Sequence, residues 1–205
     1  MVGLQFRKLQ KKLMNKIILD LCGGTGAWGR PYIEAGYDVR LVTLPDNDVT
    51  TYKLPDEPIY GILAAPPCTM FSLARTRAKK PRDFHEGMET VMACLNLIWE
   101  ARHRGKLAFW ALENPMGYLR QFLGKPPMTF QPSDFGDRYT KKTDLWGYYN
   151  MPIKKPILLT EEEKALMSTN SRKLPSISDI TGSNQAAKRA ITPRGFAEAF
   201  YKANK

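Results

Sequence analysis

The chain has 205 residues, a length that suits a single α/β domain with a buried core. Lys and Arg exceed Asp and Glu by 31 to 20, and the formal net charge of +11 predicts a polyanionic partner, for which nucleic acid is the usual candidate. Three cysteines, at positions 22, 68 and 94, and only two histidines argue against a disulfide framework and against a metal site.

The N-terminal half of the chain predicts a strand, a helix and two further strands. The basic N-terminus does not resemble a secretory signal, and no apolar run is long enough to span a bilayer, so we expect a cytoplasmic protein without a membrane partner. Residues 16–21, KIILDL, read as a buried strand that ends at glycines, and a helix then runs to Ala35. Residues 38–43 and 59–65 read as two strands, so the order predicts a mostly parallel sheet.

The C-terminal half predicts a long helix, a strand and then shorter pieces. Apolar residues recur at helical spacing before Gly105, and prolines interrupt the later pattern. The expected elements are a helix over 86–104, a strand over 107–114, edge strands within 125–156, a helix over 161–167, a loop over 168–190, and a final helix over 193–202 capped by Thr192.

A glycine-rich turn follows the first predicted strand. Residues 24–29, GTGAWG, match the pattern GxGxxG between a strand and a helix, where bare backbone approaches a nucleotide-like ligand. Asp46 and Asp48 lie about 20 residues further on, at the distance of the acid that binds a ribose. The pattern suits a nicotinamide dinucleotide and S-adenosylmethionine equally, and a tight turn without a ligand remains an alternative.

A cysteine stands just beyond the predicted strand over 59–65. Cys68 follows two prolines at the carboxyl end of this strand, the edge at which open α/β sheets bind ligands. Basic residues come next and favour both a thiolate and contact with phosphates. They are Arg75, Arg77, Lys79, Lys80 and Arg82. The loop therefore reads as a nucleophile beside a polyanion-binding segment, with a buried inert cysteine as the alternative.

Four short blocks resemble, in the same order, the motifs of the DNA cytosine-5 methyltransferases. They are Asp20-Leu21-Cys22-Gly23-Gly24-Thr25-Gly26, Asp48-Val49, Pro67-Cys68 with Phe71-Ser72, and Glu113-Asn114. The resemblance spans most of residues 16–149, with a weaker echo at 183–200. It implies a small, phage-like member of the family in a bacterial or phage-infected cell. It also implies a single domain over 1–205 with the Rossmann-like methyltransferase fold, and a reduced recognition region around 144–190.

The resemblance also implies a role for each candidate residue. Cys68 would add to carbon 6 of an extruded cytosine, Glu113 would donate to ring nitrogen 3, and Arg138 would contact the base oxygen, with Lys141 and Lys142 as alternatives. S-adenosylmethionine would be bound by Asp20, Leu21, Cys22, Gly23, Gly24, Thr25, Gly26, Asp46, Asp48, Val49 and Pro67. DNA would be bound by Ser72, Arg75, Arg77, Lys79, Lys80, Arg82, Lys141 and Lys142.

Some positions depart from the family pattern and leave alternatives open. Cys22 stands where the family has Phe, Leu44 where it has the acid that binds the ribose, and Thr69 where it has Gln. An RNA or free cytidine nucleotide substrate remains possible because the recognition region is small. A non-catalytic nucleic-acid-binding module of the same fold is a further alternative. A nicotinamide oxidoreductase accounts for the glycine turn but for neither Cys68 nor Glu113.

Overall fold

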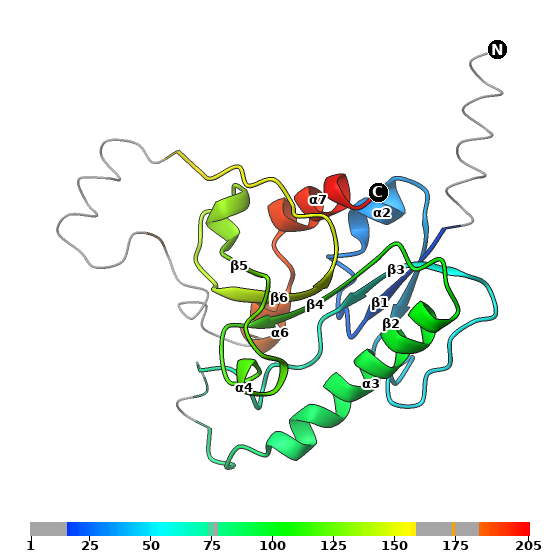
Figure 1. Cartoon of the computed structure of the whole chain (residues 1–205). Helices are drawn as coiled ribbons and strands as arrows, with labels where there is room; N and C mark the ends of the chain where they lie inside the picture. The colour runs from blue at the N-terminus through cyan, green and yellow to red at the C-terminus, as the bar shows by residue number, and fades with distance from the viewer. Residues whose placement is uncertain (1–15, 74, 76–77, 159–173, 175–184) are drawn as a thin grey trace.

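The sheet is the centre of the fold. The computed structural model describes residues 16–73, 75, 78–158, 174 and 185–205 (Figure 1). Six strands form one sheet in the order β2-β1-β3-β4-β6-β5. They are β1 (Ile17–Leu21), β2 (Asp38–Val42), β3 (Ile59–Ala64), β4 (Phe109–Pro115), β5 (Met128–Phe130) and β6 (Thr143–Tyr148). The first four pair in parallel, whereas β6 runs antiparallel to β4 and β5. The predicted mostly parallel sheet of an α/β protein is thus confirmed.

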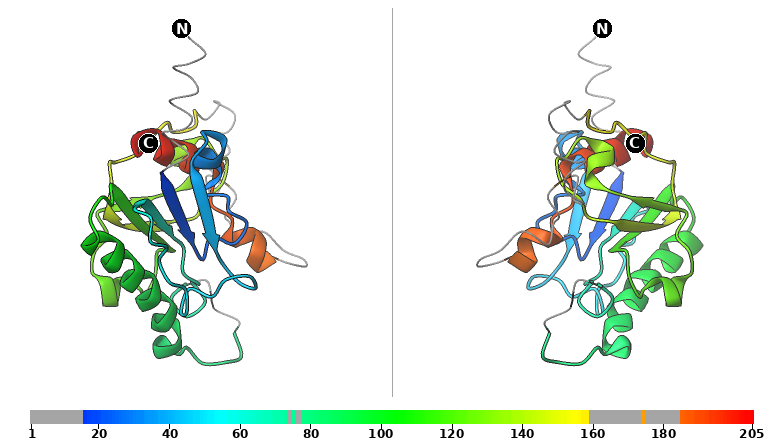
Figure 2. Two further views of the ribbon diagram at one scale, coloured as in Figure 1. Left: turned by 90° about the vertical axis from the view of Figure 1, so that its right-hand side faces the viewer. Right: turned by 90° about the vertical axis from the view of Figure 1, so that its left-hand side faces the viewer.

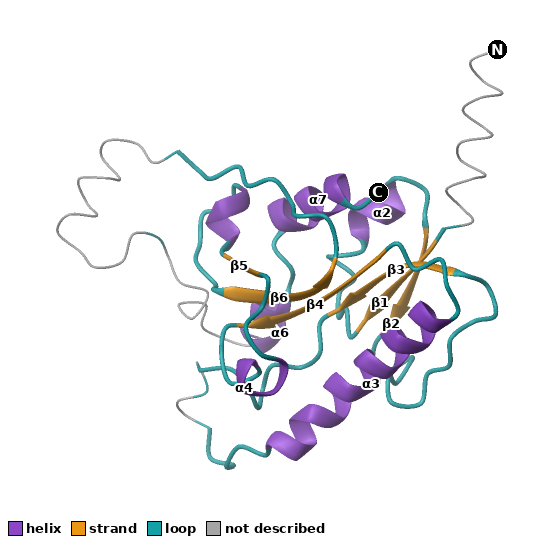
Figure 3. Cartoon of the chain, viewed as in Figure 1, coloured by secondary structure: helices purple, strands orange, loops and turns teal. Residues whose placement is uncertain are grey.

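Helices flank the sheet on both faces. They are α2 (Arg30–Glu34), α3 (Phe84–His103), α4 (Arg120–Leu123), the 3-10 helix η1 (Pro132–Phe135), α6 (Gln185–Ala190) and α7 (Arg194–Ala203). The long helix α3 covers one face, while α2 and α7 lie together on the other (Figures 1, 2 and 3). This three-layer arrangement is compatible with a Rossmann-like fold.

Strand β1 explains why the first apolar run of the sequence is continuous. All five of its residues are buried, because helices cover both faces of a central parallel strand. Leu19 and Leu21 pack into the cluster that includes Val91 and Ile98 of α3. Ile18, which points to the opposite face, packs instead with the aromatic residues under α2 and α7.

Aromatic side chains hold the C-terminal helix α7 against the rest of the domain. Phe196 stacks on Phe130 of β5 with ring centroids 4.0 Å apart, and Phe200 meets Trp28 edge-on at 5.4 Å. Trp28 belongs to the glycine turn, so α7 supports the segment that follows β1. Contacts of this geometry add to the stability that burial of the rings already provides.

The predicted helix over 86–104 is confirmed as α3, which begins two residues earlier and ends one residue earlier than predicted. The Asp83 carboxylate accepts a hydrogen bond from the Glu86 backbone N–H at 3.0 Å, and this cap fixes the beginning of the helix. The final helix is also confirmed, but the predicted cap is wrong. Pro193 occupies the cap position in an extended conformation, so α7 begins at Arg194, and no side chain caps it.

Two predictions for the C-terminal half need correction. Strand β6 is not an edge strand, because it lies between β4 and β5, and of these two later strands β5 is the one at an edge. The expected recognition region over 144–190 therefore begins inside the sheet. Residues 185–190, expected as loop, form α6, whose alanines and basic residues favour a helix. The helix expected over 161–167 falls outside the described residues.

Candidate active site

The carboxyl ends of the parallel strands gather the candidate residues at one edge of the sheet. Strand β1 pairs with β2 on one side and with β3 on the other, so the chain reverses its direction of winding at β1. A crevice outside the carboxyl end of such a strand is the usual ligand site of an open α/β sheet. The arrowheads of β1, β3 and β4 point to this edge in Figure 1. Strand β6, being antiparallel, begins at the same edge.

The glycine turn lies directly after β1 and is built around a buried acid. Asp20 is fully buried, and one of its carboxylate oxygens accepts a hydrogen bond from the Gly29 N–H at 3.2 Å. A Cβ atom at position 23 would come within 2.3 Å of the other oxygen, so only glycine fits there. That second oxygen, Oδ1, is buried without a hydrogen-bond partner. Among the residues that the structure describes, the turn therefore holds a buried acceptor with no donor.

The acidic residues after β2 differ in their surroundings. Asp48 accepts hydrogen bonds from the backbone N–H and the hydroxyl of Thr50, at 2.9 and 2.8 Å, which hold the pKa of Asp48 below its usual range. Its neighbour Val49 is buried. Asp46 and Leu44 are both exposed. The two acids expected at the nucleoside end of the site are thus on the surface beyond β2, at the same sheet edge as the glycine turn.

We expect Asp20 to make the stability of the protein depend on pH. Burial raises the pKa of Asp20 to about 7, whereas the unfolded side chain titrates near about 4. Between these values the folded chain holds a proton that the unfolded chain has released. The free energy of unfolding should therefore fall as the pH rises through this interval, by on the order of 4 kcal/mol.

Denaturant unfolding of the parent and of Asp20→Asn between pH 4 and 8 measures this contribution. The variant should show a flatter pH dependence, because Asn does not titrate. Asp56→Asn, a change at an exposed residue on the far edge of the sheet, should keep the slope of the parent. Equal slopes in the parent and Asp20→Asn would contradict the expectation.

The cysteine loop is tied to the end of strand β4. Asn114, which is fully buried, donates from Nδ2 to the Pro66 carbonyl at 2.9 Å. The Cys68 carbonyl accepts from the N–H groups of Phe71 and Ser72, at 3.0 and 2.8 Å, and so closes a tight turn. These bonds hold Cys68 in a fixed turn beside the carboxyl end of β4. Pro67, expected near the cofactor, lies exposed just before the cysteine.

Cys68, Glu113 and Lys141 form one electrostatic cluster. Desolvation by burial raises the pKa of the Cys68 thiol, the Glu113 carboxylate raises it further, and the Lys141 ammonium lowers it. Burial also raises the pKa of Glu113, against the opposing effect of Lys141. The Glu113 oxygen Oε2 is buried without a hydrogen-bond partner. The cluster therefore brings together a thiol, a carboxyl group that tends to hold its proton, and a cation.

Lys141 is predicted from the sequence both as a phosphate-binding residue and as an alternative to Arg138 at the base oxygen. Its side chain is buried and acts on both Cys68 and Glu113. Arg138, expected to contact the base, is exposed. Strand β6 begins two residues after Lys141 at the active edge, and only the antiparallel direction of β6 puts that lysine there.

Replacing Lys141 should make the Cys68 thiol less acidic. Because the ammonium group lowers the pKa of Cys68, Lys141→Met should shift that pKa upward. The matched control is Lys142→Met, a change at the adjacent exposed lysine, which should leave the pKa of Cys68 unchanged. The pH dependence of alkylation of Cys68 by iodoacetamide, followed by peptide mass spectrometry, measures both. An identical titration in the parent and Lys141→Met would exclude Lys141 from the cluster.

The basic residues after Cys68 do not form one uniform surface. Lys79 and Lys80 are exposed, and Lys80 pairs with Glu86 at 3.1 Å. Arg75 donates to the Lys80 carbonyl at 2.7 Å, and Arg77 falls outside the described residues. Ser72 pairs with Gly117 in an isolated β-bridge. Arg82 is half-buried and donates to backbone carbonyls of the cysteine loop. Lys79, Lys80 and Lys142 are thus exposed cations near this edge.

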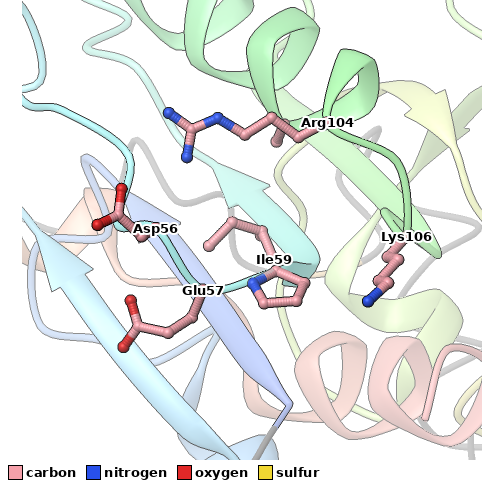
Figure 4. A pocket seen from close by; sticks show the side chains of 7 residues that line it. Asp56, Glu57, Ile59, Arg104 and Lys106 are labelled. Atoms are coloured by element: carbon pink, nitrogen blue, oxygen red, sulfur yellow. The ribbon is translucent and has the colours of Figure 1, made fainter.

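A small hollow at the opposite edge of the sheet is separate from this site. It measures about 100 Å³ and lies between the amino end of β3 and the carboxyl end of α3 (Figure 4). Its labelled residues are Asp56, Glu57, Ile59, Arg104 and Lys106. Cys68 follows the other end of β3, so this hollow takes no part in the cluster described above.

Further comparisons leave the family of the chain open. In the part of the chain that the structure describes, no helix is both long and apolar enough to cross a membrane. The same described residues contain no group of three or more His, Cys, Asp or Glu side chains that could hold a metal ion. No protein-family model matches the chain, and a search of curated proteins finds no match either.

Proposed function

We propose that this chain transfers a methyl group from S-adenosylmethionine to carbon 5 of cytosine in DNA, through a transient covalent bond from Cys68. The cluster of Cys68, Glu113 and Lys141, at the same sheet edge as the glycine turn, is the observation that carries the proposal. A nucleophile, a proton donor and a charge-stabilising cation are the groups that this reaction requires. The resemblance to the DNA cytosine-5 methyltransferases supports the same roles for Cys68 and Glu113.

Cys68 begins the proposed reaction by making the cytosine ring nucleophilic. Its thiolate adds to carbon 6, and the electron pair of the carbon 5–carbon 6 double bond moves into the ring. Carbon 5 thereby gains the character of an enamine carbon. Lys141 stabilises the thiolate form of Cys68 before this addition. S-adenosylmethionine, when bound, would supply the methyl group: carbon 5 would form its new bond as the methyl–sulfur bond breaks, and S-adenosylhomocysteine would leave with that electron pair.

Glu113 balances the charge that this addition creates. Burial raises the pKa of Glu113 and so favours its protonated form, which donates to ring nitrogen 3 as the ring becomes electron-rich. The protonated carboxyl group also carries no charge to oppose the thiolate of Cys68. Loss of the carbon 5 proton to solvent water then restores the double bond, breaks the bond to Cys68 and returns the thiolate, while the proton on ring nitrogen 3 returns to Glu113.

The residues of the glycine turn fit a nucleoside cofactor that carries positive charge. Asp20 Oδ1 is a buried acceptor without a partner, and an anionic Asp20 favours a cation. A Cβ atom at Gly24 would meet nothing within 4 Å, so space is open beside the backbone. Leu44 leaves the ribose without the family's usual acid, and we propose the exposed Asp46 or Asp48 in its place. Asp20, Gly24 and Asp48 would then hold the cofactor along the edge of the sheet.

The finer fold assignment is part of the same proposal. The described sheet is compatible with a Rossmann-like architecture, and its reversal at β1 supports a nucleoside site beyond that strand. The methyltransferase variety of this architecture accounts for a glycine turn after β1, a cysteine loop after β3, and Glu113 near the carboxyl end of the next strand, β4. A dinucleotide oxidoreductase would share the turn but would have no use for Cys68.

DNA is the substrate we favour because of the charge of the chain. A net charge of +11 exceeds what a mononucleotide requires, and the exposed lysines Lys79, Lys80 and Lys142 can contact phosphates. A cytosine in a duplex would have to leave its stack to reach Cys68, at a cost of about a few kcal/mol. RNA meets the same charge requirement, so it is the alternative that the experiment must separate.

Transfer of a labelled methyl group to mixed-sequence DNA, RNA and dCMP tests the proposal. We expect label in DNA, on cytosine carbon 5. Label in RNA or dCMP alone would keep the reaction and change the substrate. Absence of transfer to all three, together with failure to bind S-adenosylmethionine in calorimetry, would favour a non-catalytic nucleic-acid-binding module and would overturn the proposal.

A further inference from the structure

Arg82 makes contacts that a phosphate-binding arginine would not need. Its Nη1 donates to the Met70 carbonyl and its Nη2 to the Ser72 carbonyl, both at 2.8 Å. The two carbonyls are two residues apart in the turn that Cys68 begins. The planar guanidinium group, with its fixed fork of donors, matches such a pair of acceptors. Arg82 therefore holds the segment immediately after the nucleophile at two points.

The same guanidinium group links this turn to the segment after strand β4. It lies over the ring of Tyr118, with its central carbon 4.8 Å from the ring centroid. Tyr118 in turn donates its backbone N–H to the Phe71 carbonyl at 2.9 Å. Glu113 lies on β4, five residues before Tyr118. Arg82 thus connects the loop of Cys68 with the stretch of chain that carries Glu113.

Helix α3 gives this connection a rigid base. Arg82 directly precedes Asp83, the residue that caps α3, so its backbone is fixed at the start of a 20-residue helix. The first turn of α3 also contacts the loop, since a Cβ atom at Gly87 would lie only 2.8 Å from the Cβ atom of Met70. The arginine therefore projects from a fixed point onto the loop that it holds.

From these contacts we propose that Arg82 is a positioning residue and not a phosphate-binding residue. It holds the Cys68 loop at a fixed position relative to Glu113. The catalytic consequence rests on the function proposed above, whereas the effect on the loop does not. A phosphate contact would require only positive charge, which Lys also provides. Hydrogen bonds to two carbonyl groups, combined with a planar cation over the ring of Tyr118, require a guanidinium group.

Alkylation of Cys68 in the free protein tests the loop directly, without cofactor or DNA. Arg82→Lys keeps the positive charge but loses the paired bonds, so iodoacetamide should modify Cys68 severalfold faster than in the parent. Arg102→Lys, the same exchange at an exposed arginine in the last turn of α3, should leave the rate unchanged. In Arg82→Ala, added guanidinium ion should return the rate toward the parent value. Circular dichroism of each variant checks that α3 and the sheet remain folded.

Methyl-transfer kinetics then separate positioning from phosphate contact. A positioning role predicts that Arg82→Lys lowers kcat, while KM for DNA and its salt dependence stay close to the parent values. A phosphate contact predicts nearly normal kcat in Arg82→Lys, and in Arg82→Ala a raised KM with a salt slope reduced by about 1. Unchanged Cys68 alkylation in both Arg82 variants would overturn the proposal. Faster alkylation in a chain without methyl transfer would sustain the role in the loop and reject the proposed function alone.

Discussion

Cys68→Ala should abolish methyl transfer, with activity below about a ten-thousandth of the parent rate, because no other group replaces the covalent bond to carbon 6. A second result should accompany it. DNA that carries 5-fluorocytosine should form a stable adduct with the parent, since fluorine on carbon 5 cannot leave as a proton does. The adduct should shift the protein on a denaturing gel. Cys68→Ala should form no such adduct while retaining its affinity for DNA.

Thr69→Ala provides the matched control for this experiment. Thr69 is exposed and directly follows the cysteine, so its replacement tests whether any change in the loop has the same effect. We expect the adduct and most of the transfer activity to persist in this variant. Methyl transfer that survives in Cys68→Ala would rule out the covalent mechanism. An adduct that persists in Cys68→Ala would assign the nucleophile to a different residue.

Glu113→Gln should lower kcat by about 100-fold or more, because Gln has nearly the same shape but no proton to transfer. The pH profile should identify the cause. Burial raises the pKa of Glu113, and the parent rate should fall as the pH rises through that value and the proton is lost. The fall at high pH should be absent in Glu113→Gln. Single-turnover rates across the pH range measure both effects.

The same substitution should act on Cys68 in the opposite direction to Lys141→Met. The Glu113 carboxylate raises the pKa of Cys68, so Glu113→Gln should lower it, whereas Lys141→Met should raise it. Glu89→Gln, at an exposed position of α3, should change neither the kinetics nor the titration of Cys68. A Glu113→Gln enzyme with the kcat and pH profile of the parent would remove Glu113 from the reaction.

Much of the fold could be predicted because burial leaves a direct trace in the sequence. Strand β1 has the continuous sequence IILDL because both its faces are covered, and the spacing of apolar residues predicts α3. The strand order within residues 125–156 could not be predicted in this way. The interior position of β6 depends on its pairing with both β4 and β5, and pairing between distant strands has no signature in a local pattern.

The same distinction applies to the candidate site, where some residues could be placed from the sequence and others could not. The sequence predicts Cys68 just after one strand and Glu113 at the end of the next, and parallel strands end at one edge, so their proximity followed from the sequence. Their positive charge alone could not show whether Lys141 and Arg82 act inside the site or contact phosphates on the surface. Lys141 lies inside the site because β6 runs antiparallel to β4 and begins at that edge. Arg82 lies there because it donates to two carbonyls of the Cys68 loop and packs over the ring of Tyr118.

The sequence by itself thus determined the α/β class, the parallel strands and the identity of the nucleophile candidate, because hydrophobic periodicity and motif order are local properties of the chain. Only the tertiary structure decided which cations act inside the site and which face solvent. A lysine or an arginine looks the same in the sequence whether its charge meets water, a carboxylate or a backbone carbonyl. That difference depends on strand direction and side-chain burial, and both are set by contacts between residues far apart in the chain.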